Sequence, residues 1–503
     1  MHLTRILSLL VLVGAGAVQA QNPAARPSKE ITLAEALQMA LENNLEVKIQ
    51  RFNPLIAEHN LRGSYAIYEP GIALQGAHSF SSQPGGVDQF GRDIGNRELE
   101  VDNLPGVNFG LGAILPTGAR YSISENLSQT TSTIGTNVNA NFNANWSVQI
   151  TQPLLQNFWI DPGRATILIN KKTLRISETM LKGQIMTTVH SVEQAYYNLI
   201  FARENVKVVE KGLELAQRTL FENKKKVELG ALAPLDEKQA EAQVATSKAD
   251  LIAAQQNLAF QENVLKSLLT DRYESFHEVE LIPAEKLVPV PMAFNLQESW
   301  QRGLAQRPDL QQAKLDLDRR DISLKLQKNQ LLPSLDVFGR YGLTGNRLNT
   351  SYGDVLSDLT RDRNPSYTFG GSVTIPLGNI GARNRYKATR AEKEQALLQL
   401  KKLEQDIMVQ IDDAIKAVQS SFERVQATRE ARVFAETALD AEQKKLENGK
   451  STTFQVLQLQ RNLTGAAFEE IRALAEYNNA MALLAFREGT TLDRHRLHLN
   501  LQR

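Results

Sequence analysis

The chain contains no cysteine, which excludes disulfide bonds, thiolate metal sites, a cysteine nucleophile and a lipidated N-terminal cysteine. It also lacks an excess of one charge, because 57 lysines and arginines nearly balance 56 aspartates and glutamates. Nothing in that balance indicates nucleic acid as a partner. No stretch approaches the roughly 18 consecutive apolar residues of a membrane-spanning helix, so a membrane crossing would have to use β-strands.

The N-terminus carries an export signal. His2 and Arg5 precede an apolar run at 6–13, and small residues lead up to Ala20. This order is typical of a secretory signal peptide at 1–20, and the run is too short for a retained anchor. The polar segment at 21–30 is expected to be a disordered lead.

The chain uses one order of elements twice. The sequence predicts a capping box at Thr32 with Glu35, and a second one 263 residues later at Asn295 with Glu298. We therefore expect a first repeat at 31–270, an extended linker at 271–294, a second repeat at 295–488 and a polar tail at 489–503. A unit of this size used twice favours a closed symmetric assembly over a compact enzyme.

Alternating apolar and polar residues predict four strands, near 72–82, 142–152, 335–345 and 367–376. The alternation is unbroken in 142–151, where Phe142, Trp146 and Ile150 share one side. Such alternation fits a strand with one apolar and one wet face, either in a membrane barrel or in a soluble antiparallel sheet. The export signal and the flanking helices favour the barrel.

The distribution of proline predicts very long helices. Proline is absent between Pro162 and Pro234 and again after Pro376. The predicted helices are 163–229, 235–270, 382–448 and 453–488, so that each repeat ends in a helical hairpin.

Apolar spacing supports these helices. From Val192 to Val227 an apolar residue recurs every seven positions, and small residues such as Ala195 and Ala202 follow three residues later. That spacing indicates a closely packed coiled-coil seam. After Leu403 the steps are 4, 4 and 3, the spacing of a nearly straight helix.

The first repeat contains an inserted segment at 83–141 that has no counterpart in the second. Within it, residues 107–115 and 119–127 alternate and are joined by Leu115-Pro116-Thr117-Gly118, which predicts a hairpin. The hairpin at 107–127 either forms an extracellular loop or adds two strands to the barrel. We favour the loop because the second repeat lacks this hairpin.

With these features the chain resembles the TolC family of outer-membrane efflux channels over about residues 31–490. The resemblance is carried by the duplicated order, the opening Thr32-Leu33-x-Glu35-Ala36-Leu37, the strand exit Gln152-Pro153-Leu154 and the glycine-containing hairpin tips. It implies an α+β membrane protein built from a duplicated helix–strand–long helical hairpin unit. Three copies would form a 12-stranded outer-membrane β-barrel, with four strands from each, that continues into a periplasmic α-helical barrel.

The resemblance also implies a function. The protein would be the outer-membrane exit duct of a tripartite efflux or type I secretion system, a passive conduit in the outer membrane with a large periplasmic portion. Its partners would be its own copies in a homotrimer, a periplasmic adaptor (membrane fusion) protein, an inner-membrane pump and outer-membrane lipid, without nucleic acid or a cofactor. The alternative is a periplasmic coiled-coil adaptor, although adaptors have one helical hairpin and this chain has two.

The family places a periplasmic gate at the hairpin tips. Here the gate would comprise Gly230, Asp236, Gly449, Lys450, Gln455 and Gln458. Asp236 matches a polar gate position and equally suits a helix cap. Gln455 and Gln458 stand where the family pattern places acids, so we expect weak block by multivalent cations. Lys450 is either a solvated lysine, which we favour, or a partner of Asp236 across the protomer boundary.

No catalytic, cofactor-binding or metal-binding set emerges from the sequence. His495 and His498 have a common spacing and lie in the polar tail. Gly110-Leu111-Gly112 lacks the third glycine and the following helix of a nucleotide-binding loop. The sequence therefore predicts a channel rather than an enzyme.

Overall fold

The computed structural model describes residues 27–87, 89–93, 95–134, 137–230, 232–361 and 364–497. The predicted signal peptide at 1–20, most of the lead at 21–30 and His498 lie outside these residues. The chain forms two compact units, the first built mainly from 189–291 and 419–481, the second mainly from 45–188 and 292–418.

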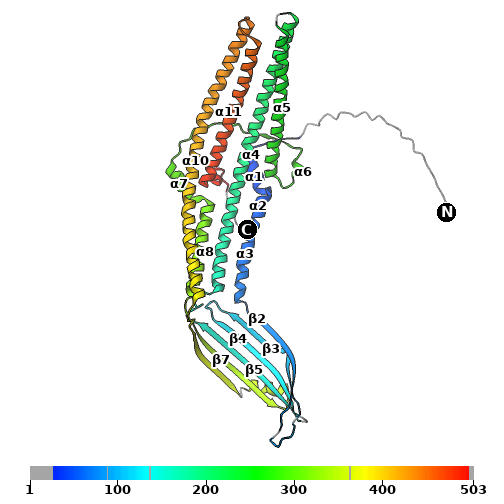
Figure 1. Ribbon diagram of the computed structural model, residues 1–503, viewed down its shortest axis with the longest axis vertical. Helices are drawn as coiled ribbons and strands as arrows, with labels where there is room; N and C mark the ends of the chain where they lie inside the picture. Colours follow the sequence, from blue (N-terminus) through cyan, green and yellow to red (C-terminus); the bar gives the residue numbers. More distant parts are fainter. Residues whose placement is uncertain are drawn as a thin grey trace, which may run out of the picture. The chain divides into compact units, whose positions relative to one another are not determined.

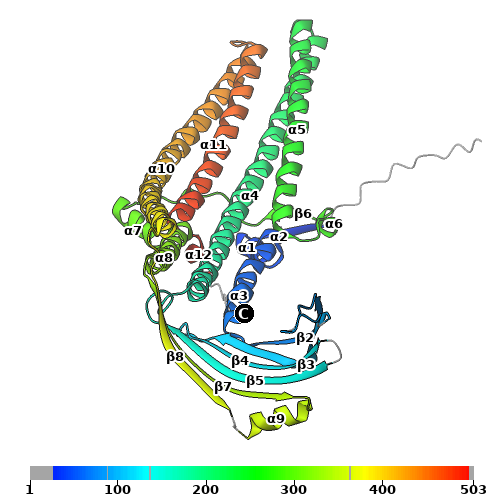
Figure 2. The same ribbon diagram turned by 60° about the horizontal axis from the view of Figure 1, so that its bottom comes forward.

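Long helices dominate the first unit, and a sheet dominates the second. The helices are α1 (Leu33–Asn43), α2 (Leu45–Gln50), α3 (Phe52–Ser64), η1 (Tyr65–Tyr68), α4 (Pro162–Glu228), α5 (Pro234–Leu269), α6 (Tyr273–Phe276), α7 (Leu296–Gln306), α8 (Pro308–Asn329), α9 (Tyr352–Thr360), α10 (Ile380–Glu447), α11 (Thr453–Glu488) and α12 (Thr491–Arg494). The strands are β1 (Ser28–Ile31), β2 (Gly71–Gln83), β3 (Arg97–Ile114), β4 (Arg120–Ile134), β5 (Asn137–Pro153), β6 (Glu280–Pro283), β7 (Ser334–Leu348) and β8 (Pro365–Thr374). In Figures 1 and 2, α4 lies beside α5 and α10 lies beside α11.

The two repeats begin with different helix caps. At the first, the Glu35 N–H donates to Thr32 Oγ1 (3.2 Å) and the Thr32 N–H donates to Glu35 Oε2 (3.1 Å), which is a capping box. At the second, Asn295 Oδ1 accepts the Gln297 N–H (3.1 Å), and Asn295 Nδ2 donates to Glu298 Oε1 (3.0 Å). The prediction of a second capping box is wrong, because the asparagine amide takes the carboxylate that would have bonded the backbone.

Two segments are more ordered than the sequence suggested. Residues 28–30, expected to be disordered, belong to β1, which pairs in parallel with β6 so that Ser28 lies opposite Glu280. The linker at 271–294 contains α6 and β6. Tyr196 Oη donates to the carbonyl oxygen of Ile31 at 3.0 Å and so fixes β1 to α4. The partners are far apart in sequence, so no local pattern reveals them.

The core of each unit follows one long helix. In the first unit Val192 and Leu199 of α4 are fully buried, as the seam predicted. In the second unit Ile407 and Ile411 of α10 are fully buried. A Cβ at Gly303 of α7 would lie 2.4 Å from Cδ1 of Ile411, so the glycine allows α7 to pack closely on α10.

One sheet contains six antiparallel strands in the order β2-β3-β4-β5-β7-β8. The inserted segment therefore supplies β3 and β4, which lie between β2 and β5. The favoured loop interpretation is wrong, and the sheet has six strands per copy where the resemblance implied four. Alternation could not decide this, because a free hairpin and a hairpin paired on both sides show the same pattern.

Helix α9, which the sequence did not predict, packs against one end of β5 and β7 (Figure 2). Its Val355 is fully buried in a cluster with Leu127, Phe142 and Ala144. A Cβ at Gly345 would lie 2.7 Å from the carbonyl oxygen of Val355, so glycine permits the contact.

An ion pair also holds α9 in place. Nε and Nη2 of Arg347 donate to the two carboxylate oxygens of Asp358, each at 2.8 Å. Such a bidentate pair fixes orientation as well as distance.

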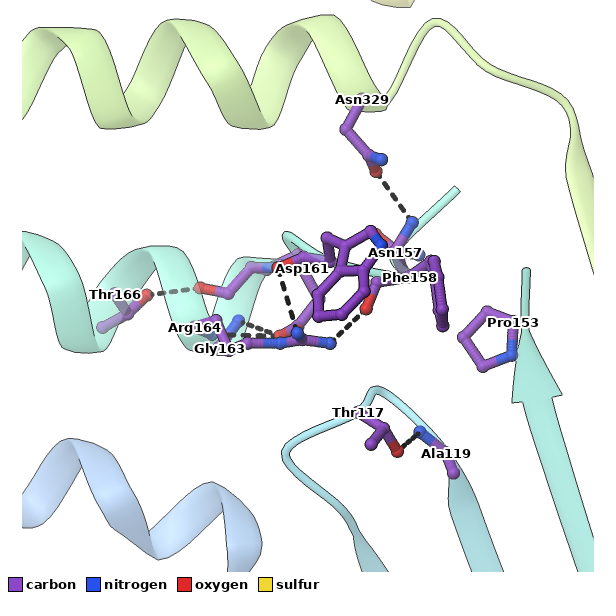
Figure 3. A network of polar contacts seen from close by, with 12 residues as sticks. Thr117, Ala119, Pro153, Asn157, Phe158, Asp161, Gly163, Arg164, Thr166 and Asn329 are labelled. Atoms are coloured by element: carbon purple, nitrogen blue, oxygen red, sulfur yellow. Dashed lines mark hydrogen bonds and ion pairs between the residues drawn. The ribbon is translucent and has the colours of Figure 1, made fainter. Parts of the chain in front are cut away.

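A polar network turns the chain from β5 into α4 (Figure 3). Asp161 Oδ1 accepts the backbone N–H of Arg164 (3.0 Å) and caps the first turn, while Arg164 Nε donates to Asp161 Oδ2 (2.6 Å). Arg164 Nη1 donates to the carbonyl oxygen of Trp159 at 2.9 Å. Asn157, with φ at 64°, donates its N–H to Asn329 Oδ1 at the end of α8 (2.7 Å). The strand exit is thereby bonded to both neighbouring helices.

Candidate functional site

The first hairpin tip joins α4 to α5. Gly230 has φ at 74°, and its N–H donates to the carbonyl oxygen of Val227 at 2.9 Å, so α4 ends in a left-handed glycine cap. Pro234 occupies the first turn of α5, where its missing N–H would have no helical partner. Asp236 Oδ2 accepts the Ala233 N–H at 3.2 Å. Asp236 therefore caps α5, and its role in a gate stays a prediction.

The second tip joins α10 to α11. Gly449 has φ at 70° and donates its N–H to the carbonyl oxygen of Leu446 at 3.1 Å. The Lys450 N–H donates to the carbonyl oxygen of Lys445 at 2.8 Å. Together these are the two hydrogen bonds of a Schellman motif, which terminates a helix with a reversal of the chain.

Side-chain contacts that the sequence did not predict also stabilise the second tip. Ser451 Oγ donates to Glu442 Oε1 at 2.6 Å, and Lys445 Nζ lies 3.0 Å from Glu442 Oε2. The hydrogen bond from Ser451, followed by that from Lys445, lowers the pKa of the Glu442 carboxyl. The sequence does place Ser451 two residues after Gly449 and Glu442 seven residues before it. Whether their side chains meet depends on the angle of the turn, which the spacing does not fix.

The remaining predicted gate residues make contacts within their own hairpin. The Gln455 N–H donates to Thr452 Oγ1 at 3.4 Å, and Gln455 Oε1 accepts from Ser451 Oγ at 3.3 Å. Gln458 Nε2 donates to Asn462 Oδ1 at 3.2 Å along α11. Lys450 is exposed. The structure thus brings Gly449, Lys450 and Gln455 together in one tip, and Gly230 and Asp236 together in the other.

Polar and aromatic contacts join α4 to α11 below the tips. Gln460 Nε2 donates to Thr219 Oγ1 at 2.9 Å, and both side chains are buried. The rings of Phe201 and Phe468 are 5.6 Å apart. These contacts connect α4 of the first hairpin to α11 of the second within one copy.

Ion pairs join the helices of the second hairpin. Arg424 of α10 lies 2.9 Å from Glu469 and 2.7 Å from Glu476, both on α11. All three side chains are about 40% exposed. Exposed pairs of this kind contribute little to stability, about 0–1 kcal/mol each.

One group of potential metal ligands lies on the sheet. His78 Nδ1 is 2.5 Å from Asp102 Oδ1, and His78 Nε2 is 3.7 Å from Glu100 Oε1. The sequence could not reveal this group, because a register shift between Gln75 and Ala77 sets which residue of β3 faces His78. Exposed carboxylates beside a histidine are common, and we assign them no function.

Within the described residues, no helix contains an 18-residue window apolar enough to cross a membrane. Residues 115–270 and 300–489 match the outer membrane efflux protein family. The chain belongs to this family. Members of the family are channels rather than enzymes, and the chain is accordingly an exit duct of the outer membrane.

Individual members of the family are distant in sequence. Outer membrane protein TolC of Escherichia coli is 24% identical over 362 residues, covering 70% of this chain and 71% of TolC. Cation efflux system protein CusC of Escherichia coli is 23% identical, covering 55% of this chain and 58% of CusC. Cobalt-zinc-cadmium resistance protein CzcC of Cupriavidus metallidurans is 24% identical, covering 66% of this chain and 73% of CzcC.

Solved outer-membrane channels share the fold. The Campylobacter jejuni CmeC channel matches with a TM-score of 0.64 at 17% identity, covering 91% of this chain and 86% of CmeC. Vibrio cholerae VceC matches with a TM-score of 0.64 at 16% identity, covering 91% of this chain and 96% of VceC. The predicted fold class of an outer membrane efflux protein is therefore confirmed, and the alternative of a periplasmic adaptor is set aside.

Proposed function

We propose that three copies of the chain close into one passive conduit, and that the hairpin tips form its gate at the periplasmic end. Cargo would enter from a periplasmic adaptor and an inner-membrane pump. The proposal rests chiefly on the sheet, in which β2 and β8 each leave one edge unpaired within the described residues of one copy.

In the part of the chain that the structure describes, the sheet of one copy has two open edges, at β2 and β8. In hydrocarbon every backbone N–H and C=O must be bonded, so an open sheet edge is not tolerated there. The six strands alternate in direction, so β2 at one edge runs opposite to β8 at the other. The β8 edge of one copy can therefore pair in antiparallel fashion with the β2 edge of the next.

The long helices supply the second argument, because they leave large apolar side chains uncovered. Leu229 and Leu235 at the first tip are 83% and 66% exposed, and Phe434 on α10 is 70% exposed. Uncovered apolar groups at this density mark a surface that packs against another copy or a partner. Lateral packing of the hairpins of three copies would cover them.

The backbone geometry of the hairpin tips supports their proposed role as a gate. Each tip turns at a glycine with positive φ, which few other residues adopt without strain. Rearrangement of the contacts around Gly230 and Gly449 would open the conduit without an energy source in the chain itself.

Two measurements test the proposal. Protein purified in detergent should run as a heat-modifiable band of three times the chain mass, and it should form ion-conducting pores when added to planar lipid bilayers. A product that stays monomeric without detergent, or bilayers that remain silent at protein concentrations sufficient for insertion, would refute it.

A further inference from the structure

One row of side chains crosses all six strands of the sheet. Residues directly opposite each other in antiparallel strands lie on the same face. The register gives the continuous row Ile72, Leu111, Ile123, Val148, Tyr341 and Tyr367, one from each strand. Every member is apolar or aromatic, and the inserted strands β3 and β4 supply two of them, Leu111 and Ile123.

The neighbouring row lies on the opposite face and has the opposite character. Its members are Ala73, Gly110, Ser124, Ser147, Gly342 and Ser366. The hydroxyls of Ser124 and Ser147 lie 3.0 Å apart, and Arg340 Nη2 donates to Ser147 Oγ at 3.2 Å. The sheet therefore has an apolar face and a small, polar face, as expected of a wall between lipid and an aqueous lumen.

The apolar face continues on both sides of this row. Towards α9 lie Leu74, Phe109, Trp146 and Leu343, together with Glu125 as the one charged member. Away from α9 lie Ala113, Tyr121, Ile150, Gly339 and Phe369. Ile72 and Phe369 are 69% and 80% exposed, so one copy leaves the outer strands of this face uncovered.

The inserted strands are also long enough to span a bilayer. β3 has 18 residues and β4 has 15, whereas a tilted strand needs roughly 9–11 to cross the hydrocarbon. A hairpin that stood above the membrane would have no reason to place apolar residues level with those of β5 and β7.

We propose that the inserted hairpin is part of the membrane wall, so that three copies with six strands each close an 18-stranded barrel through pairing of β8 with β2 of the next copy. This inference rests on the trimeric conduit proposed above. Barrel diameter grows roughly linearly with strand number, so the outer segment would be about half again as wide as one with four strands per copy. The barrel would then not be the narrowest point of the conduit.

Fluorescence quenching by lipid tests the position of the hairpin. The chain contains no cysteine, so each single substitution gives one labelling site. Leu111→Cys and Ile123→Cys would be labelled with an environment-sensitive fluorophore and reconstituted into vesicles that contain nitroxide-bearing lipid. Two matched controls are Val148→Cys, in the same row on β5, and Ser124→Cys, on the opposite face of β4. Retention of the trimer band would establish that each variant assembles.

The outcomes separate the two proposals. If Leu111→Cys and Ile123→Cys lose as much fluorescence as Val148→Cys, and Ser124→Cys loses little, the hairpin lies in the wall. If Val148→Cys is quenched but the two hairpin sites are not, the 18-stranded wall is wrong while the conduit stands. If Val148→Cys is not quenched either, the sheet does not face lipid, and the proposed function fails together with the inference.

Disulfide formation tests the joint between copies. Ile72→Cys on β2 would be combined in turn with Tyr367→Cys, Phe369→Cys and Val373→Cys on β8, because strand pairing brings opposite Cα atoms within the range of a disulfide. We expect at least one combination to give covalently linked copies on a non-reducing gel. The matched control is Ile72→Cys with Val148→Cys, which lie three strand spacings, roughly 14 Å, apart in one sheet. A disulfide in the control with none in the other pairs would place β2 beside β5 and overturn the proposal.

Discussion

The two hairpin tips use the same backbone geometry but hold the returning helix by different means. Both reverse the chain at a glycine with φ near 70°, at Gly230 and Gly449. At the first tip, α5 is held locally by the bond from the Ala233 N–H to Asp236. At the second, Ser451 bonds to Glu442 on α10, which ties the turn to the helix before it.

The difference predicts which tip moves first. Opening the second tip requires loss of a hydrogen bond to a charged carboxylate, and such bonds are stronger than those between neutral groups. The cap at the first tip lies wholly within the start of α5 and travels with it. We therefore expect opening of the first tip to require less free energy than opening of the second. The second tip should be the one that keeps the channel closed.

Substitution of the tip glycines gives the largest expected effect and tests the shared geometry. A Cβ at Gly230 or at Gly449 would meet nothing within 4 Å, so only backbone strain opposes a side chain. Gly230→Val and Gly449→Val should each destabilise their tip by about 1–2 kcal/mol, the cost of the left-handed conformation. Amide hydrogen exchange of residues 225–240 and 445–460 measures this.

Asparagine supplies the control for these variants. Asn adopts positive φ more readily than other residues, so Gly230→Asn and Gly449→Asn should cost clearly less than valine. If valine left amide exchange unchanged at one tip and accelerated it at the other, the two turns would not share the same backbone conformation.

Loss of the hydrogen bond between Ser451 and Glu442 should have the next largest effect, and it should affect the second tip only. Ser451→Ala should accelerate amide exchange at 445–460 and leave 225–240 unchanged. Ser451→Thr, which keeps the hydroxyl, is the matched control. Equal acceleration at both tips after Ser451→Ala would contradict independent fastening.

The same bond makes the second tip sensitive to acid. The pKa of Glu442 is lowered in the folded protein, chiefly by the hydrogen bond from Ser451 and then by Lys445. Its contribution is therefore fully present above the unfolded value of 4.5 and is lost as the pH falls through the lower folded value. Channel opening in bilayers should rise over that acidic window in the native protein, and Ser451→Ala should flatten the rise.

Features encoded by local sequence were predictable. Missing prolines and the apolar seam from Val192 onward predicted the long helices, because helix periodicity needs no distant partner. The glycines at 230 and 449 marked the tips, because positive φ selects glycine within a few residues.

Features that depend on distant partners were not predictable. Placement of β3 and β4 within the sheet depends on pairing with β2 and β5, and α9 depends on burial of Val355 against β4 and β5 of the first repeat. The contact of Ser451 with Glu442 depends on the angle between two helices, which no spacing rule fixes.

Two substitutions of Asp236, both of small expected effect, distinguish its role as a helix cap from its role in the gate. Asp236→Asn keeps an oxygen that accepts the Ala233 N–H but removes the charge, whereas Asp236→Ala removes both. Asp236→Ala should destabilise the start of α5 by about 1 kcal/mol, and Asp236→Asn by less.

Block of single channels by multivalent cations measures the gate role of Asp236. Because Gln455 and Gln458 carry no charge, block should be weak in the native protein and should vanish in Asp236→Asn. Strong block that persists in Asp236→Asn would place the cation site elsewhere.

Lys450 should have the smallest effect of the tip residues. Its backbone N–H completes the Schellman motif at Gly449, and substitution leaves that bond intact. The side chain is exposed, so a pair with Asp236 of a neighbouring copy would contribute at most about 1 kcal/mol. Lys450→Ala should therefore shift the open fraction in bilayers only slightly, and less at high salt, where exposed pairs are screened. An open fraction identical to that of the native protein at low salt would mean that the amine has no partner across the boundary, and that the second tip is held by Ser451 and Glu442 within one copy.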